Sequence, residues 1–353
     1  MTSKLWGQTL NRFARSVYWK LRSVVALSYG LVHFGIFGKT PDIAYQSMIY
    51  LFCTTKGRFS DWVSSLISLK HPPISLVNTK GVLGDMSDRK NLAQIVGQIR
   101  NRGFVVFPSA LPNEVIDRLH KFTRKTPGLA RRMDEQNTSL YVGKKIYTGF
   151  GPAAVRYDYD PGDLLNNEDI QTLLADGSLL SIVQEYLQCL PIADVLSMWW
   201  HTNFDDKPNS EAAQFYHFDM DRFKWVKIFI YLTDVGEENG PHSFVEGSHK
   251  TGAIPTHILN KGYVRISDEE ISRTYSLDLV HSFVAPRGTI IIEDTRGMHK
   301  GSHVRGDSRL ILQMQFSNSL FGATYPKATI SNIKSESFKR VLDSSPRIYG
   351  QYL

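Results

Sequence analysis

Three residues in two separated segments form a pattern that could bind a metal ion. His217 and Asp219 stand one residue apart in the run 214–219, and His299 follows 82 positions after His217. Because a β-strand directs residues i and i+2 to the same face, His217 and Asp219 would point at one place. Two imidazoles and one carboxylate, with the remaining positions open, are the ligand set of non-haem Fe(II) oxygenases.

The bulk composition is that of a folded protein with a sizeable core. The chain has 353 residues, of which 42% are hydrophobic and 12% aromatic, which suits one large domain with an extension or two modest domains. Cys53 and Cys189 are the two cysteines and form no CxxC pair, so a disulfide framework or a thiolate zinc site is not expected. We therefore expect a reducing compartment, the cytoplasm.

The positive charge of the chain is concentrated at its N-terminal end. Residues 1–80 contain ten Lys or Arg against two Asp, a net charge of +8, whereas the whole chain carries +7. The rest of the chain is therefore nearly neutral, which does not indicate a groove for nucleic acid.

An apolar series with helical spacing crosses this basic segment, and residues 1–41 contain no acid. One interpretation is an amphipathic helix packed on the catalytic domain, and the other is a helix in peripheral contact with an anionic membrane. The apolar stretch 24–37 is shorter than the ~20 residues that a membrane span needs. The helical series comprises Leu10, Phe13, Val17, Leu21, Val24 and Leu27.

The elements that would position the metal ligands begin after residue 85. We expect a basic, mostly helical extension over 1–85, a mainly β domain over 86–325 and a C-terminal segment over 326–353, because Pro72-Pro73 and a polar, turn-rich stretch separate helical from strand-like sequence. Many short strands with Gly/Pro turns and no βαβ rhythm favour a jelly roll or barrel. Expected strands are 103–107, 193–203, 214–219, 226–232, 288–293 and 310–316; expected helices are 91–100, one starting at Pro112 and one opened by a capping box at 267–270.

Residues 90–320 resemble the phytanoyl-CoA dioxygenase family of Fe(II)/2-oxoglutarate oxygenases. A lone His-x-Asp would be weak evidence, since short motifs match by chance, but five segments occur in the family's order. These segments are 103–107 with Pro112-Asn113-Glu114, 216–219, Ile230 to Asp234 with Asn239-Gly240-Pro241, Gly247-Ser248-His249, and Met298 to Gly301 with Arg309. Glu246 stands where the family's turn has proline.

The resemblance implies a double-stranded β-helix (jelly roll, cupin-like) with flanking helices, and an iron site of His217, Asp219 and His299. The 2-oxoglutarate would bind iron and place its far carboxylate on a cation, for which a guanidinium offers two parallel hydrogen bonds. Arg309 begins an expected strand, whereas the alternative Arg305 stands in a loop beside Gly306 and is a poorer platform. Asp221 is the alternative ligand to Asp219, but the i,i+2 spacing from His217 favours Asp219.

Four further residues are candidates for the cosubstrate pocket, with ordinary core or surface roles as the alternative. They are Trp200, Lys227, Tyr231 and Ser302. His201, His242, His257 and His281 are interpreted as structural, and His303 as a loop residue, since most histidines are not ligands.

The resemblance implies an enzyme that uses Fe(II), 2-oxoglutarate and O2 to hydroxylate an unactivated C–H of a small organic substrate, lipid-like or a natural product, with succinate and CO2 as coproducts. Asp219 supports hydroxylation, because the family's halogenase relatives lack this carboxylate. The alternatives are desaturation, epimerisation or cyclisation at the same iron, and a non-catalytic relative that binds a ligand or acts as a membrane scaffold.

Overall fold

The computed structural model describes residues 2–133, 139–205, 207–208 and 213–353. Its largest element is an antiparallel sheet with the strand order β3-β11-β8-β13-β7-β6-β4-β5. A smaller sheet has the order β10-β9-β12, and β1 pairs with β2. The strands are β1 (Lys80–Gly81), β2 (Gly84–Asp85), β3 (Phe104–Phe107), β4 (Gly128–Met133), β5 (Ser139–Lys145), β6 (Arg156–Asp158), β7 (Ile192–His201), β8 (Trp225–Tyr231), β9 (His242–Val245), β10 (Val280–Ser282), β11 (Ile290–Glu293), β12 (His299–Gly301) and β13 (Arg309–Ser317).

The two faces of the large sheet have different neighbours. Even-numbered side chains of its central strands, such as Met198, Ile228 and Leu312, belong to the main hydrophobic core. Odd-numbered side chains, such as Phe229 and Ile311, share a second cluster with Phe244 of the small sheet. Because successive residues of a strand point to opposite faces, this alternation fixes which side chains can reach the space between the sheets.

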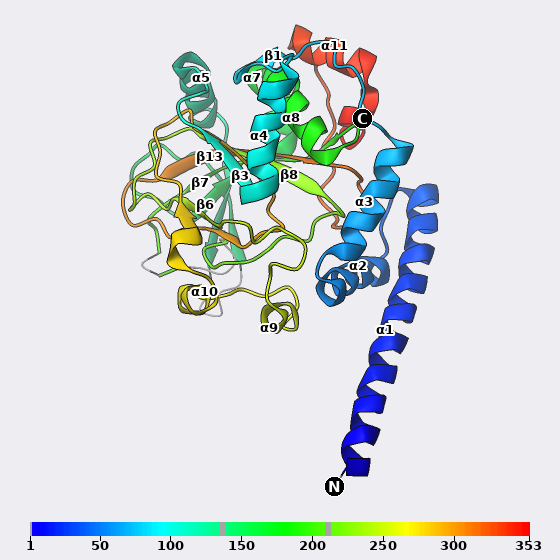
Figure 1. Ribbon diagram of the computed structural model, residues 1–353. Helices are drawn as coiled ribbons and strands as arrows, with labels where there is room; N and C mark the ends of the chain where they lie inside the picture. The colour runs from blue at the N-terminus through cyan, green and yellow to red at the C-terminus, as the bar shows by residue number, and fades with distance from the viewer. Residues whose placement is uncertain (1, 134–138, 206, 209–212) are drawn as a thin grey trace.

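Helices cover the outer face of the large sheet (Figure 1). Leu92 and Ile99 of α4 and Leu179 and Val183 of α8 pack into the main core. The helices after the N-terminal three are α4 (Arg89–Arg102), α5 (Asn113–Thr123), α6 (Pro161–Leu165), α7 (Glu168–Leu174), α8 (Gly177–Leu187), α9 (Thr256–Leu259), α10 (Asp268–Thr274) and α11 (Glu336–Ser344), with short 3₁₀ helices at Leu277–Leu279 and Pro346–Tyr349.

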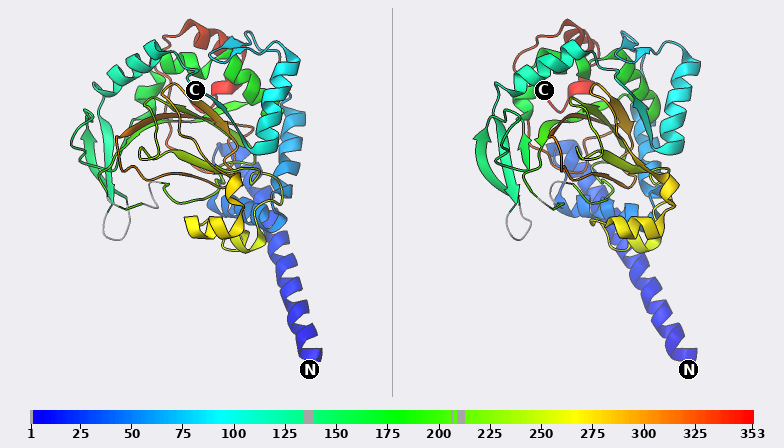
Figure 2. Two further views of the ribbon diagram at one scale, coloured as in Figure 1. Left: turned by 60° about the vertical axis from the view of Figure 1, so that its left-hand side comes forward. Right: turned by 90° about the vertical axis from the view of Figure 1, so that its left-hand side faces the viewer.

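The N-terminal helices α1 (Thr2–Phe37), α2 (Asp42–Thr55) and α3 (Arg58–Lys70) lie beside the sheets, and the N-terminal part of α1 extends away from the body (Figures 1 and 2). Leu27 of α1 and Met48 of α2 pack with Phe223 and Phe321. Asp61 of α3 lies 2.9 Å from the buried Arg296. Within the described residues, no helix is long and apolar enough to cross a bilayer.

The expected fold class is confirmed: the chain is mainly antiparallel β with flanking helices and an N-terminal helical part. The predicted strand 214–219 is wrong as a strand, because only Tyr216 and His217 make bridges and the backbone is then irregular. Pro112 lies one residue before α5, as its N-cap. The remaining expected strands and helices are present within a few residues, and α6 to α8 were not anticipated.

Candidate metal centre

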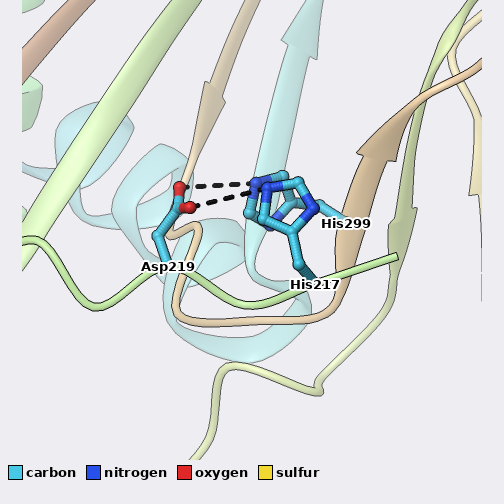
Figure 3. A group of neighbouring side chains, drawn as sticks. All are labelled: His217, Asp219 and His299. Carbon is cyan, nitrogen blue, oxygen red and sulfur yellow. Dashed lines mark ion pairs between the residues drawn. The ribbon is translucent and has the colours of Figure 1, made fainter. Parts of the chain in front are cut away.

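His217, Asp219 and His299 converge at one place inside the protein (Figure 3). Their candidate ligand atoms all lie within 4.8 Å of one another. The Asp219 carboxylate places Oδ1 at 3.6 Å from His217 Nε2 and Oδ2 at 3.4 Å from His299 Nε2. The three side chains are buried, with exposed fractions of 5%, 6% and 4%. This arrangement surrounds a point that a single cation could occupy.

Backbone pairing brings the two histidines together although they are far apart in sequence. His217 and His299 are partners in an antiparallel bridge, with reciprocal N–H to carbonyl hydrogen bonds of 2.9 and 2.8 Å. Residues directly opposite each other in such a pair point to the same face. The backbone N–H of Asp219 donates to Thr295 (2.8 Å), which holds the carboxylate beside both rings.

Hydrogen bonds at the other ring nitrogens orient both imidazoles. His217 Nδ1 lies 2.9 Å from the carbonyl oxygen of Phe215, and His299 Nδ1 lies 2.9 Å from that of Gly297. A carbonyl accepts only, so each Nδ1 carries the proton and each Nε2 keeps its lone pair toward Asp219. This is the usual outer support of a metal-binding histidine, and the three residues fit a divalent metal.

Burial and the neighbouring charges shift the pKa of each member of the triad. Burial, and then the neighbouring His299, hold the pKa of His217 well below its usual value. Burial opposes the charge on His299 too, but the Asp219 carboxylate raises the pKa of His299. Burial would raise the pKa of Asp219, yet Lys227 and His299 hold it well below its usual range. Asp219 is therefore an anion, as a ligand must be.

Lys227 of β8 is the cation next to this carboxylate. Its Nζ lies 2.5 Å from Asp219 Oδ2 and 3.2 Å from Asp221 Oδ2. Both acids raise the pKa of Lys227 against the opposing effect of burial. Asp221, the alternative ligand, pairs with Lys227 and is not one of the converging three.

A cavity of about 330 Å³ lies beside the triad, between the two sheets. Arg309 lines it from β13, is 2% exposed, and donates to the carbonyl oxygen of Gly240. Its Nη2 lies 3.2 Å from His201 Nδ1. Arg309 Nε and His201 Nε2 are buried and lack hydrogen-bond partners among the described residues. Unpaired buried polar groups are costly, so this end of the cavity fits an anionic, hydrogen-bonding ligand such as the oxoglutarate carboxylate.

The other sequence candidates take different places. Trp200 does not reach the cavity: it packs in the main core, with ring contacts to Tyr147 and His120, whereas Trp199 lines the cavity. The prediction for Trp200 is corrected by one residue, because adjacent residues of β7 face opposite sides of the sheet.

Tyr231 and Ser302 stand outside the cavity wall. The Tyr231 hydroxyl accepts from the backbone N–H of His242 (2.9 Å) and interacts with the Arg309 guanidinium. Ser302 lines a separate surface cavity together with Arg305, contrary to the prediction of a cosubstrate contact. Arg305 is paired with Glu238 at 2.7 Å, so of the two arginines considered as the cosubstrate anchor, Arg309 is the one that lines the triad's cavity.

Sequence reasoning missed two histidines that line the cavity, His201 and His242. His242 Nε2 lies 2.9 Å from the fully buried Glu293, and its ring centroid is 5.6 Å from that of His299. Burial raises the pKa of Glu293 to about 8 and holds that of His242 well below its usual value. The pair is thus a neutral hydrogen bond near pH 7 rather than an ion pair. The alternation of side chains along β7 could have indicated His201, because the odd-numbered residues of that strand point to the cavity.

Several solved structures are similar to the chain in fold. They include the non-heme alpha ketoglutarate dependent epimerase SnoN from nogalamycin biosynthesis, with 14% identity, a TM-score of 0.48 and coverage of 65% of this chain and 84% of that chain. HygX from Streptomyces hygroscopicus with nickel and 2-oxoglutarate bound shows 15% identity, a TM-score of 0.44 and coverage of 68% and 93%. No curated protein matches the chain.

The family comparison is more direct, because it rests on the sequence itself. The model described as phytanoyl-CoA dioxygenase (PhyH) matches residues 99–310, more than half of the chain. The matched range contains His217, Asp219, His299 and Arg309. The chain therefore belongs to the phytanoyl-CoA dioxygenase family and is an Fe(II)- and 2-oxoglutarate-dependent oxygenase.

Proposed function

We propose that His217, Asp219 and His299 bind Fe(II), that Arg309 binds the far carboxylate of 2-oxoglutarate, and that the enzyme hydroxylates a C–H bond of a small organic substrate. The observation that carries the proposal is the convergence of two Nε2 atoms and one carboxylate beside a cavity that Arg309 also lines. Two imidazoles and a carboxylate as ligands leave positions open for a cosubstrate and oxygen.

The bound metal and cosubstrate would supply the oxidation, with oxoglutarate converted to succinate and CO2. The residues of the chain would hold the metal and the cosubstrate in position beside the cavity. Lys227 holds Asp219 Oδ2 by a 2.5 Å hydrogen bond, which favours ligation through the other carboxylate oxygen. Arg309 fixes the cosubstrate at one end of the cavity, so the substrate must enter from the other.

The same site supports desaturation, epimerisation or cyclisation, since the placement of the substrate decides the fate of the carbon centre after C–H cleavage. We place hydroxylation first because Asp219 occupies the carboxylate position that the family's halogenase relatives lack. A non-catalytic relative is disfavoured, because the ligand residues and the cosubstrate arginine are all present and oriented.

Metal and cosubstrate binding test the proposal without knowledge of the substrate. Anaerobic protein should bind about one Mn(II), followed by 2-oxoglutarate, and should release succinate slowly with Fe(II), ascorbate and O2. His217→Ala should abolish all three, whereas His257→Ala, which changes an exposed histidine near Glu270, should change none. Wild-type protein that binds neither Mn(II) nor 2-oxoglutarate would refute the assignment.

We further propose that α1 contacts an anionic membrane surface peripherally and that the protein works in the cytoplasm, where its two free cysteines stay reduced. The solvent-facing side of α1 carries an apolar stripe at spacings of three and four residues, while Leu27 and Ala26 on the opposite side are buried. The stripe comprises Tyr18 (62% exposed), Leu21 (63%), Val25 (69%), Tyr29 (56%), Val32 (65%) and Ile36 (68%).

The charges around this stripe support an anionic membrane as its partner. Residues 1–41 contain no acid, and Arg22, whose guanidinium lies over the Trp19 ring at 4.7 Å, is next to the stripe. Apolar side chains flanked by basic ones are the pattern of helices that lie in an anionic lipid interface.

Vesicle sedimentation tests this proposal on the full chain. Wild-type protein should sediment with vesicles of phosphatidylglycerol and phosphatidylcholine, and less with phosphatidylcholine alone. The double variant Val25→Asp/Val32→Asp should stay in solution, whereas Leu277→Asp, at an apolar position 69% exposed elsewhere, should still sediment. Equal binding by wild type and double variant would refute the membrane contact, as would a dimer in solution that the double variant dissociates.

A further inference from the structure

Arg265 lies opposite His217, a proposed iron ligand, on the neighbouring backbone segment, and is not itself a proposed ligand. Tyr216 and Ile266 form an antiparallel bridge, with reciprocal hydrogen bonds of 3.1 and 2.8 Å. The next pair in that register is His217 with Arg265. Directly opposed residues share a face, so Arg265 points into the cavity as His217 does, and it is one of the residues that line it.

The neighbours of Arg265 follow the same alternation. Val264 and Ile266 pack into a hydrophobic cluster with Phe218, which fixes the segment in place. Tyr263 stands two residues before Arg265 and therefore points to the same side, away from Val264 and Ile266. It lines the cavity together with Arg265 and is 48% exposed. The Arg265 guanidinium lies 5.8 Å from the Tyr263 ring centroid. An exposed aromatic ring and an exposed cation thus stand together where the cavity meets solvent.

Arg265 differs from Lys227 and Arg156, two other cations of the cavity, because no described acid pairs with it. Lys227 pairs with Asp219 and Asp221, and Arg156 pairs with Asp158 at 2.5 Å. Within the part of the chain that the structure describes, no carboxylate pairs with Arg265, although its neighbours in the cavity form ion pairs.

The described residues that line the cavity are more cationic than anionic. They include Arg156, Lys227, Arg265 and Arg309 against the carboxylates of Asp219 and Asp221. Asp158 pairs with Arg156 at 2.5 Å but also with Arg131 at 3.6 Å. Among the four lining cations, Arg265 is the exposed one.

We propose that Arg265 binds an acidic group of the substrate, a carboxylate or a phosphate, and that the Tyr263 ring covers the adjacent apolar part. This inference rests on the proposed function and adds the chemical class of the substrate to it. A guanidinium pairs with either acid through two parallel hydrogen bonds. The substrate is therefore an organic acid or phosphate ester rather than a neutral molecule.

Paramagnetic relaxation tests the proposal with three matched probes: octanoate, octyl phosphate and octan-1-ol. The protein is loaded with Mn(II) and 2-oxoglutarate under nitrogen, and broadening of the probe proton signals is titrated, which reports only binding close to the metal. At least one acidic probe should bind wild type tenfold or more tightly than octanol, equivalent to about 1.4 kcal/mol. The comparison of octanoate with octyl phosphate identifies the preferred acid.

The variants separate Arg265 from general electrostatics. Arg265→Gln should reduce the preference for the acidic probe at least tenfold, Arg265→Lys should retain part of it, and Arg305→Gln, which removes an exposed cation paired with Glu238, should leave it unchanged. A preference that is equal in wild type and Arg265→Gln, or absent in wild type, overturns the proposal. In either case intact binding of Mn(II) and 2-oxoglutarate shows that the proposed function itself still stands.

Discussion

Replacement of Arg309 by glutamine should selectively destroy the binding of 2-oxoglutarate. The guanidinium is 2% exposed, lines the cavity beside the triad, and has an Nε without a hydrogen-bond partner among the described residues. A carboxylate would gain two hydrogen bonds from it. Bonds to a charged group contribute about 1.5–3 kcal/mol each, so the loss is roughly 3–6 kcal/mol. That corresponds to roughly a 10²- to 10⁴-fold increase in Kd.

The assay is anaerobic calorimetric titration of 2-oxoglutarate into the Mn(II)-loaded protein, supported by the KM for succinate formation with Fe(II). Retained Mn(II) binding by Arg309→Gln would show that the variant is folded. Arg305→Gln is the matched control, because Arg305 lies four residues away, is exposed, and pairs with Glu238 at the surface, where such pairs contribute little. Its Kd should change by about twofold at most. A Kd for Arg309→Gln within threefold of wild type would refute the role of Arg309.

Three further outcomes are expected from the buried charges. His299→Ala removes one of three proposed ligands and should weaken Mn(II) binding by roughly a hundredfold or more, since even outer-shell changes cost 10–100-fold; Mn(II) EPR that matches wild type would contradict this. Asp194→Ala leaves Arg222, which is paired with it at 2.7 Å and nearly inaccessible, without its counter-charge and should cost about 3–5 kcal/mol in urea unfolding; an unchanged midpoint would speak against it. Arg296 holds the pKa of the buried Asp294 carboxyl at about 2 against the opposing effect of burial. In the unfolded chain this carboxyl becomes protonated already at about pH 4. The contribution of Asp294 to the free energy of unfolding is therefore complete above about pH 4, and about 2 kcal/mol of it should be lost as the pH falls toward 2. Urea unfolding of Asp294→Asn should lack this part of the pH dependence, and identical slopes for both proteins would disprove the assignment.

Local patterns in the sequence were sufficient to predict the central strands of the large sheet and the proximity of His217 and Asp219. The run of β-rich residues before Tyr231 and the one after Arg309 became β8 and β13, because alternation of side chains is a property of neighbouring residues. His217 and Asp219 lie together because they are two residues apart, although the strand expected there does not form. His299 could be placed only through the resemblance to a family, since a bridge over 82 positions leaves no mark on local sequence.

The tertiary structure decided which residues complete the cavity. Trp199 rather than Trp200 faces it, because the register of β7 against β13 fixes which parity points inward. Arg265 is placed beside the cavity by a bridge between two irregular segments, and no periodic pattern in the sequence predicts such a bridge. The outward apolar stripe of α1 could not be predicted from the sequence either. The helix has apolar residues on both sides, and only the packed structure decides which side remains exposed. Sequence determines the direction of each side chain relative to its neighbours, whereas the pairing of distant backbone segments determines what those side chains meet.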